Sequence, residues 1–416
     1  MGNNKGFTLV EMIVAMAIFM GIMIMATYGF ERVLVGTGQQ TKSAQSNFEG
    51  VVGLEMLRYD VEHAGYGLPW DFLNYASNSA IQFQNLGGTA NKELDVGANV
   101  PVAGIDATTL NAVLTDDIHA FSAGTATKEV GGTAVSHSSG GPDYLVMRSV
   151  ISALDDATSK WTYVNYSGNT TGNYSKMKEW DNSEDLTSAD RFITIRSTFT
   201  TSGEQNKTLL MDGSNFEVNV SAGGDLPAGD AFKPADSAQV VVAYGIRSAS
   251  ESALRMPYNR TDFFVSRPTD KMPQWCNPGT GILYKTMVDH GTGEFGPPYP
   301  LLECIGDLQV EFEYDEDEDG DAIILPPALL NTHTAHEIRS HLKNVRIYIL
   351  AHEGKMDRGY NYPKDSIHVG DPNNPSPSLS GRILSSSDMA SLFTADWRKY
   401  RWKIYTMVVR PKNLNQ

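Results

Sequence analysis

Cysteine is scarce in this chain, with only Cys276 and Cys304 among 416 residues. Neither belongs to a CxxC pair, and no second pair exists that could complete a zinc site. If the chain is exported, a disulfide between the two is the simplest interpretation, and two buried reduced thiols are the alternative. A bridge of this span would stabilise the fold by about 3–4 kcal/mol.

Basic residues are also in the minority, with 33 Lys and Arg against 49 Asp and Glu, a net charge of -16 and an isoelectric point near 5.0. Proteins that bind nucleic acid normally carry a basic face, so we expect no nucleic-acid partner for the chain as a whole.

Patterns typical of enzymes are missing too. The sequence has no GxSxG nucleophile motif and no glycine-rich phosphate loop ahead of a helix. His336, Glu337 and His341 come near the zinc motif HExxH. However, the two histidines are five residues apart instead of four and would lie about 140° apart around a helix. The sequence therefore predicts a protein that is not an enzyme.

Proline is absent before Pro69, and residues 7–30 are almost wholly apolar, which predicts a helix long enough to cross a bilayer. The one charge in this segment is Glu11. A secretory signal peptide would need a shorter apolar core followed by small residues. A plain membrane anchor would avoid a carboxylate, which costs at least about 2.5 kcal/mol within the membrane.

A third interpretation explains Glu11. Gly6-Phe7-Thr8-Leu9-Val10-Glu11, preceded by a lysine, closely resembles the class III signal of type IV prepilins and type II secretion pseudopilins. The resemblance implies that a membrane peptidase cuts after Gly6 and methylates Phe7. When processed helices pack side by side, the Glu11 carboxylate of one subunit can then neutralise the Phe7 ammonium of its neighbour.

Beyond the apolar segment, Leu54, Leu57, Val61 and Ala64 recur at helical spacing, so the helix is expected to continue and to pack this face against a sheet. Short apolar runs between Gly, Ser, Asn and Asp then predict strands. Among these, residues 342–350 and 402–409 are expected to form long strands of the final sheet. Residues 307–314 alternate strictly, which is typical of a strand with one solvent-exposed face.

These patterns predict an α+β fold, with a long N-terminal hydrophobic helix followed by mostly antiparallel β-sheet domains, as in pilins. We divide the chain into five segments: a leader peptide at 1–6, a transmembrane and assembly helix at 7–30, its amphipathic continuation at 31–68, a β-rich and loop-rich insert at 69–235, and a C-terminal β-rich domain at 236–416.

Four further segments, 57–67, 143–148, 342–347 and 401–410, resemble minor pilins of the PilW type. The resemblance implies a minor pilin that helps initiate type IV pilus assembly at or near the pilus tip and supports pilus biogenesis, motility or adhesion. Pseudopilins of the J class share the pattern at the helix end. A minor pseudopilin of a type II secretion system is therefore the main alternative, and a membrane-anchored hydrolase or binding protein is another.

The resemblance also implies partners and a location. The partners are the prepilin peptidase, the inner membrane, and other minor pilins and the major pilin through the N-terminal helix. The chain would cross the inner membrane once, with a periplasmic C-terminal domain, and would later reach the pilus or cell surface.

The most acidic stretch is Asp315 to Asp321. Asp315, Asp317 and Asp319 alternate ahead of a glycine, like the first half of an EF-hand calcium loop. The twelfth position, where an EF-hand has glutamate, is Pro326. The sequence thus leaves two interpretations: a calcium site that includes Asp315, Asp317, Asp319 and Asp321, or a solvated acidic turn between strands. No other cofactor is expected.

Overall fold

The computed structural model describes residues 8–70, 120–125, 141–166, 177–181, 183–199, 203, 205–212, 215–220, 226, 231–250, 254, 256–268, 272–290, 296–330, 332–372 and 381–414. The predicted leader, including Gly6, and the predicted new N-terminus Phe7 lie outside the described residues.

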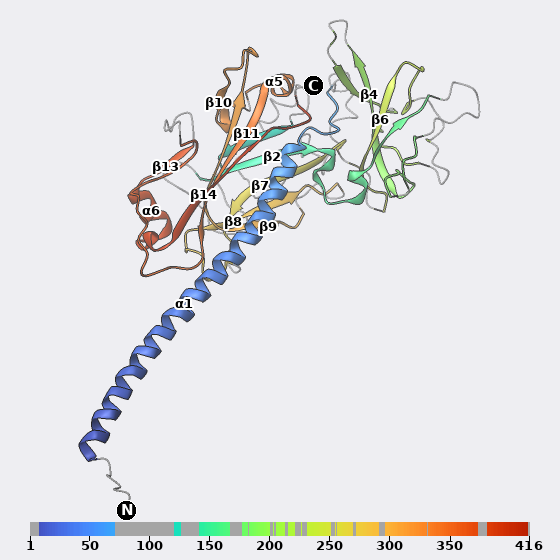
Figure 1. Ribbon diagram of the computed structural model, residues 1–416. Coiled ribbons are helices and arrows are strands. Elements are labelled where there is room, and N and C mark those ends of the chain that lie inside the picture. Colours follow the sequence, from blue (N-terminus) through green and yellow to red (C-terminus); the bar gives the residue numbers. More distant parts are fainter. Residues whose placement is uncertain are drawn as a thin grey trace, which may run out of the picture.

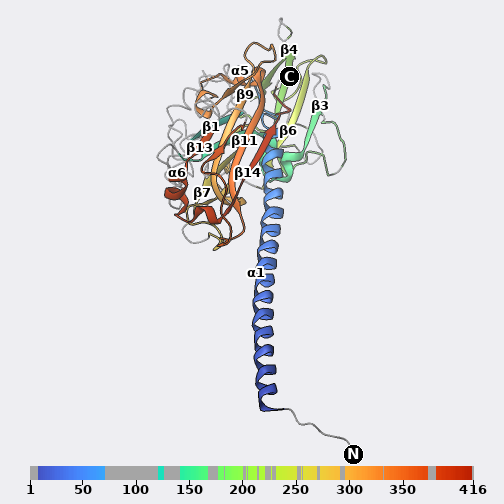
Figure 2. The same cartoon turned by 60° about the vertical axis from the view of Figure 1, so that its left-hand side comes forward.

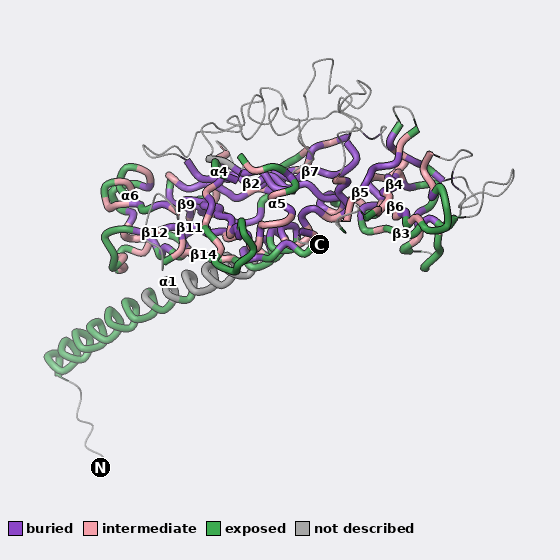
Figure 3. Tube along the Cα trace, turned by 90° about the horizontal axis from the view of Figure 1, so that it is seen from above, coloured by how far each residue is buried: buried purple, intermediate pink, exposed green. Residues whose placement is uncertain are grey.

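A single helix, α1 (Leu9–Glu62), runs for 54 residues. Its first 23 residues, Leu9–Glu31, have a mean hydropathy of 2.4 and extend away from the sheets with their side chains exposed (Figures 1 and 3). At about 1.5 Å per residue they are long enough to cross a bilayer. Past His63, Gly65 and Gly67 adopt positive φ angles of 79° and 68° and turn the chain away from the helix axis.

The C-terminal part of α1 packs on the large sheet, as the amphipathic spacing predicted. Leu57, Val61 and Ala64 are fully buried in the main hydrophobic core. Gly53 allows the helix to approach closely, because a Cβ there would lie 2.0 Å from the carbonyl oxygen of Leu301. Figure 2 shows α1 beside this sheet and projecting far beyond it.

The large sheet has eight antiparallel strands in the order β1-β2-β7-β8-β9-β11-β14, with β10 paired to β9. Its strands are β1 (Phe121–Thr125), β2 (Asp143–Ser149), β7 (Asn259–Ser266), β8 (Gly281–Met287), β9 (Tyr299–Tyr314), β10 (Ile323–Leu325), β11 (Leu342–Glu353) and β14 (Arg401–Val409). Two short helices, α4 (Pro327–Leu330) and α5 (Ala335–His341), follow β10. The strands expected at 342–350 and 402–409 are confirmed as β11 and β14.

A separate four-stranded antiparallel sheet lies past the C-terminal end of α1 (Figure 1). Its order is β3-β6-β4-β5, formed by β3 (Trp161–Val164), β4 (Asp190–Phe199), β5 (Gln205–Leu209) and β6 (Val240–Ser248). The short 3₁₀ helices η1 (Val150–Ser152) and η2 (Asp156–Ser159) connect β2 to β3. This sheet has its own small core around Phe192, Val241 and Leu186.

A third unit consists of β12 (Ile367–Val369), β13 (Arg382–Leu384), α6 (Ser386–Phe393) and η3 (Trp397–Lys399). Its core joins Phe393 and Trp397 to Leu350 and Trp402 of the large sheet. Together these elements confirm the predicted α+β, pilin-like architecture: one long apolar helix followed by mostly antiparallel sheet.

The two sheets draw strands from both sides of the expected boundary between 235 and 236. The large sheet takes β1 and β2 from the predicted insert, and the four-stranded sheet takes β6 from the predicted C-terminal domain. The five-segment division stays a prediction.

One expectation about β9 is wrong. Residues 307–314 do form a strand, but the polar face that we expected to be wet is largely covered. Asp307, Gln309 and Glu311 are buried, and Glu313 is half-buried. Two of these carboxylates are paired: Arg382 of β13 reaches Asp307 at 3.3 Å, and Arg346 of β11 reaches Glu313 at 2.9 Å. Buried charges are tolerated when they are paired in this way.

Candidate functional site

Glu11 caps the helix in which it stands. Its Oε2 accepts hydrogen bonds from the backbone N–H of Thr8 at 3.0 Å and from the Thr8 hydroxyl at 2.9 Å, while the Glu11 N–H donates to Thr8 Oγ1 at 3.3 Å. This reciprocal arrangement is a capping box. The Thr-x-x-Glu spacing that signals it is visible in the sequence, from which we predicted only a pairing of Glu11 with the amine of a neighbouring subunit.

The apolar segment above this cap is exposed along its whole length. Leu9 is 77% exposed and Met25 78%, and no residue of Leu9–Glu31 is buried within the chain. A continuous apolar surface of this size is covered by lipid or by other apolar helices in a stable assembly. The segment is therefore built for contacts outside the chain.

The other end of α1 is fixed to the large sheet by a buried ion pair. Lys285 of β8 lies 2.6 Å from the Asp60 carboxylate, and both side chains are almost fully buried. Burial raises the pKa of Asp60, and the nearby Lys285 ammonium partly offsets this. Two residues further on, Glu62 forms an ion pair with the exposed Lys412. These contacts hold the C-terminal part of the helix against the β-sheet.

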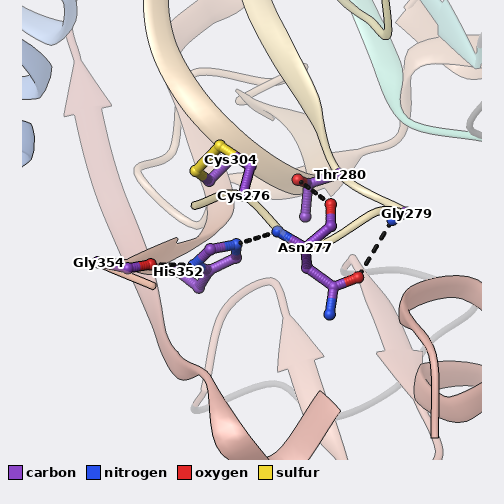
Figure 4. Close-up of a disulfide and its surroundings, with 7 residues drawn as sticks. All are labelled: Cys276, Asn277, Gly279, Thr280, Cys304, His352 and Gly354. Atoms are coloured by element: carbon purple, nitrogen blue, oxygen red, sulfur yellow. Dashed lines mark hydrogen bonds between the residues drawn. A yellow bond between two sulfur atoms is a disulfide. The ribbon is translucent and has the colours of Figure 1, made fainter. Parts of the chain in front are cut away.

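The two cysteines are brought together beside the large sheet. Sγ of Cys276 lies 1.93 Å from Sγ of Cys304, and the Cα atoms are 5.0 Å apart, so the pair is at disulfide distance (Figure 4). Cys304 belongs to β9, and Cys276 lies in the loop before β8. Their placement fits the predicted disulfide and not the alternative of two separate thiols.

His352 supports this loop as a neutral ring. Its Nε2 accepts the backbone N–H of Asn277 at 2.8 Å, so its Nδ1 carries the hydrogen and donates to the carbonyl of Gly354 at 3.1 Å (Figure 4). The rings of Tyr400 and Trp402 pack against it. Burial lowers the pKa of His352 to about 4, because protonation would place a charge in this apolar site and break the bond from Asn277.

We expect the stability of the β domain to fall on acidification through His352. An unfolded histidine has a pKa of about 6.5, so the unfolded chain binds this proton first, and stability present above that pH is lost as the pH falls towards 4. The expected loss between about pH 7 and pH 4.5 is about 2–3 kcal/mol. Urea unfolding of the wild type and His352→Gln at both pH values measures it, because the difference between the two proteins removes the contributions of other groups. An equal pH dependence in both would contradict this expectation.

The acidic run forms the loop of the hairpin between β9 and β10, where Ile323 pairs with Tyr314. One carboxylate oxygen from each of Asp315, Asp317 and Asp319 lies within 4.8 Å of the others. Asp321 is adjacent: its N–H donates to Asp319 Oδ1 at 3.0 Å, and a hydrogen bond between the two carboxyls raises the pKa of Asp321. The structure thus gathers three of the four predicted ligands, with the fourth beside them.

Asp315 differs from its neighbours in being buried. Its side chain is only 6% exposed, and its Oδ2 lies 3.7 Å from the Lys343 ammonium. Its Oδ1 has no hydrogen-bond partner in the part of the chain that the structure describes. A buried carboxylate oxygen without a partner is unfavourable unless a cation or water satisfies it.

The histidine segment has a structural role. Glu337 accepts the backbone N–H of Thr334 at 2.7 Å, and Thr334 Oγ1 accepts the N–H of Glu337, so Glu337 caps α5. His341 contacts the carbonyl of Asp315 at 3.1 Å. Glu337, the acidic residue of the near-match to HExxH, is therefore the capping residue of a short helix.

Comparison with known protein families gives one finding. Residues 1–27 match the prokaryotic N-terminal methylation motif, the type IV prepilin-like signal. No curated protein and no solved structure matches the chain. The motif supports a type IV pilin or pseudopilin, a structural class of protein, and implies processing by a prepilin peptidase and association with a membrane. The apolar helix Leu9–Glu31 fits a single-pass anchor with a C-terminal domain.

Proposed function

We propose that this chain is a minor pilin of the PilW type that helps initiate type IV pilus assembly and sits at or near the pilus tip. The observation that carries the proposal is the continuous helix α1. It begins beside a prepilin signal, continues as an exposed apolar segment and ends packed against a large β domain. Such a bulky domain is difficult to repeat along a thin fibre and fits more easily at its end.

In this proposal the membrane holds α1 until assembly. The β domain lies on the periplasmic side of the inner membrane, and cleavage after Gly6 frees the amine of Phe7. Apolar helices of other minor pilins and the major pilin then replace lipid around Leu9–Glu31. Because Asp60 and Lys285 fix α1 to the sheet, movement of the helix into a fibre carries the β domain with it.

A deletion strain tests this function. We expect few or no surface fibres by electron microscopy, with loss of fibre-dependent motility or adhesion, and full recovery when the wild-type chain is restored. Normal fibres with loss of secreted enzymes would replace this proposal with a minor pseudopilin of type II secretion. A deletion that changes neither would contradict both functions.

We also propose that the acidic hairpin loop binds calcium. The support is the convergence of Asp315, Asp317 and Asp319 together with the unpaired, buried Oδ1 of Asp315. Calcium prefers carboxylate oxygens and tolerates irregular geometry, so the missing twelfth-position glutamate of an EF-hand does not exclude it. The ion would relieve the repulsion between the carboxylates and tie down the turn between β9 and β10.

Calcium titration of the full-length chain tests this site. We expect one ion per chain with a dissociation constant of about 0.1–1 mM, the range of extracellular calcium modules. Asp315→Asn and Asp317→Asn should each abolish binding, whereas Glu316→Gln, in the same loop but outside the converging set, should leave it unchanged. Absence of binding at several millimolar calcium, or equal loss in the Glu316 control, would contradict the site.

A further inference from the structure

The edge of the four-stranded sheet carries three aromatic side chains that contact one another: Trp161, Tyr163 and Trp180, here called the aromatic patch. Side chains alternate between the faces of a strand, so Trp161 and Tyr163 of β3 project from the same face. Trp180 comes from the neighbouring segment, in which Lys178 N–H donates to the carbonyl of Tyr163 at 2.9 Å. The ring centroid of Trp161 is 5.5 Å from that of Tyr163 and 5.5 Å from that of Trp180.

These rings are exposed and yet held in place. Each of the three residues is between 37% and 40% exposed, so the contacting rings form one exposed aromatic surface. The indole N–H of Trp180 donates to the carbonyl of Trp161 at 3.1 Å, and the Lys178 ammonium lies 3.8 Å from the centre of the Trp180 ring. The patch therefore keeps its shape without a ligand, and its side chains would lose little conformational entropy when a ligand binds.

The patch borders a hollow of about 320 Å³ lined by Ser159, Trp161, Trp180 and Glu184. Two indole rings thus face the same space as a hydroxyl and a carboxylate. Sugar rings present the matching chemistry, because a hexose has an apolar face of C–H groups and a rim of hydroxyls. A hexose in this hollow would offer its C–H face to the indoles and its hydroxyls to Glu184 and to Ser159, whose own hydroxyl donates to the carbonyl of Asp156 at 2.9 Å and can still accept a hydrogen bond.

The charge around the patch selects among possible ligands. Carboxylates predominate, from Glu179, Asp181, Glu184 and Asp185. Among the residues that the structure describes here, the ammonium group of Lys178 lies over Trp180 and that of Lys160 pairs with Asp190 at 3.0 Å. Nucleic acids and anionic lipid surfaces require basic groups at the contact, so this surface favours an uncharged ligand.

Figures 1 and 2 place the four-stranded sheet at the end of the molecule away from the N-terminus of α1, and β3 is its edge strand. We propose that the aromatic patch of Trp161, Tyr163 and Trp180, with Ser159 and Glu184, binds a neutral polysaccharide by stacking against its hexose rings. This binding is independent of the assembly role of α1.

Depletion assays on insoluble polysaccharides test the proposal. The full-length chain, kept in a detergent without sugar headgroups that could compete, is mixed with microcrystalline cellulose, chitin or starch granules. We expect saturable binding to at least one of them. Trp161→Ala and Trp180→Ala should each weaken that binding by about tenfold. Phe199→Ala removes an exposed ring from β4 of the same sheet and should leave binding unchanged.

A second measurement uses only the wild-type chain, so it does not depend on whether the variants fold. Bound polysaccharide should protect Trp161 and Trp180 from chemical oxidation, as read by mass spectrometry, while the oxidation of the half-buried Trp275 stays unchanged. No binding to any of the three polysaccharides would overturn the proposal. Binding that is insensitive to both tryptophan substitutions would also overturn it. If the variants bind polysaccharide like the wild type but no longer assemble with other pilins, the patch is a protein interface and the proposal is overturned.

Discussion

Replacement of Glu11 by glutamine should abolish incorporation into fibres while leaving membrane insertion intact. Gln can still cap the helix, because a capping box accepts Glu or Gln at this position. It cannot neutralise the Phe7 ammonium of a neighbouring subunit. Loss of one partner from a buried ion pair costs about 3–5 kcal/mol, so incorporation should fall by more than about a hundredfold.

The matched control is Thr8→Val, which removes the hydroxyl of the capping box and retains the Glu11 charge. It should cost about 1 kcal/mol of helix capping and leave assembly largely intact. Immunoblots of sheared fibres measure incorporation, and alkaline extraction of membranes measures insertion. Normal assembly of Glu11→Gln together with failure of Thr8→Val would mean that Glu11 acts only as a cap.

The second large effect is expected from the cysteine pair. Replacing both Cys276 and Cys304 by serine should lower the free energy of unfolding by about 3–4 kcal/mol, because the bridge closes a loop with a sequence separation of 28. Cys304 stands two residues from Leu302, which a Cβ at Gly50 of α1 would meet at 2.6 Å. The bridge therefore stabilises the part of β9 that receives the assembly helix.

Urea unfolding of the full-length chain, followed by tryptophan fluorescence, measures this effect. The wild type treated with a reductant is the natural control and should match the double variant. We also expect the steady-state amount of the double variant in cells to be lower than that of the wild type. A double variant as stable as the oxidised wild type would show that the bridge adds nothing.

The sequence predicted the large features because their signals are local. The apolar run of Leu9–Glu31 and the spacing of Leu57, Val61 and Ala64 each specify a helix face within a few turns. The runs that became β11 and β14 are likewise continuous in the chain. The Thr-x-x-Glu signal of the capping box at Thr8 is equally local. It was missed because pairing with the amine of another subunit already explained the charge of Glu11.

The remaining features depend on contacts between distant segments. The polar face of β9 is buried because Arg382, 75 residues further along, pairs with Asp307. The aromatic patch exists because the segment around Trp180 pairs beside β3, and nothing in the local pattern of Trp161 and Tyr163 indicates this partner. Local periodicity cannot report such coverage, because a side chain that alternates outward is exposed only if no other segment folds over it.

Mass spectrometry of purified surface fibres tests whether this chain is a processed minor pilin. We expect the chain to be present in small amounts and its N-terminal peptide to begin at N-methylated Phe7, without residues 1–6. Fibres that lack the chain, or a cellular pool in which every copy retains Met1 to Gly6, would contradict it.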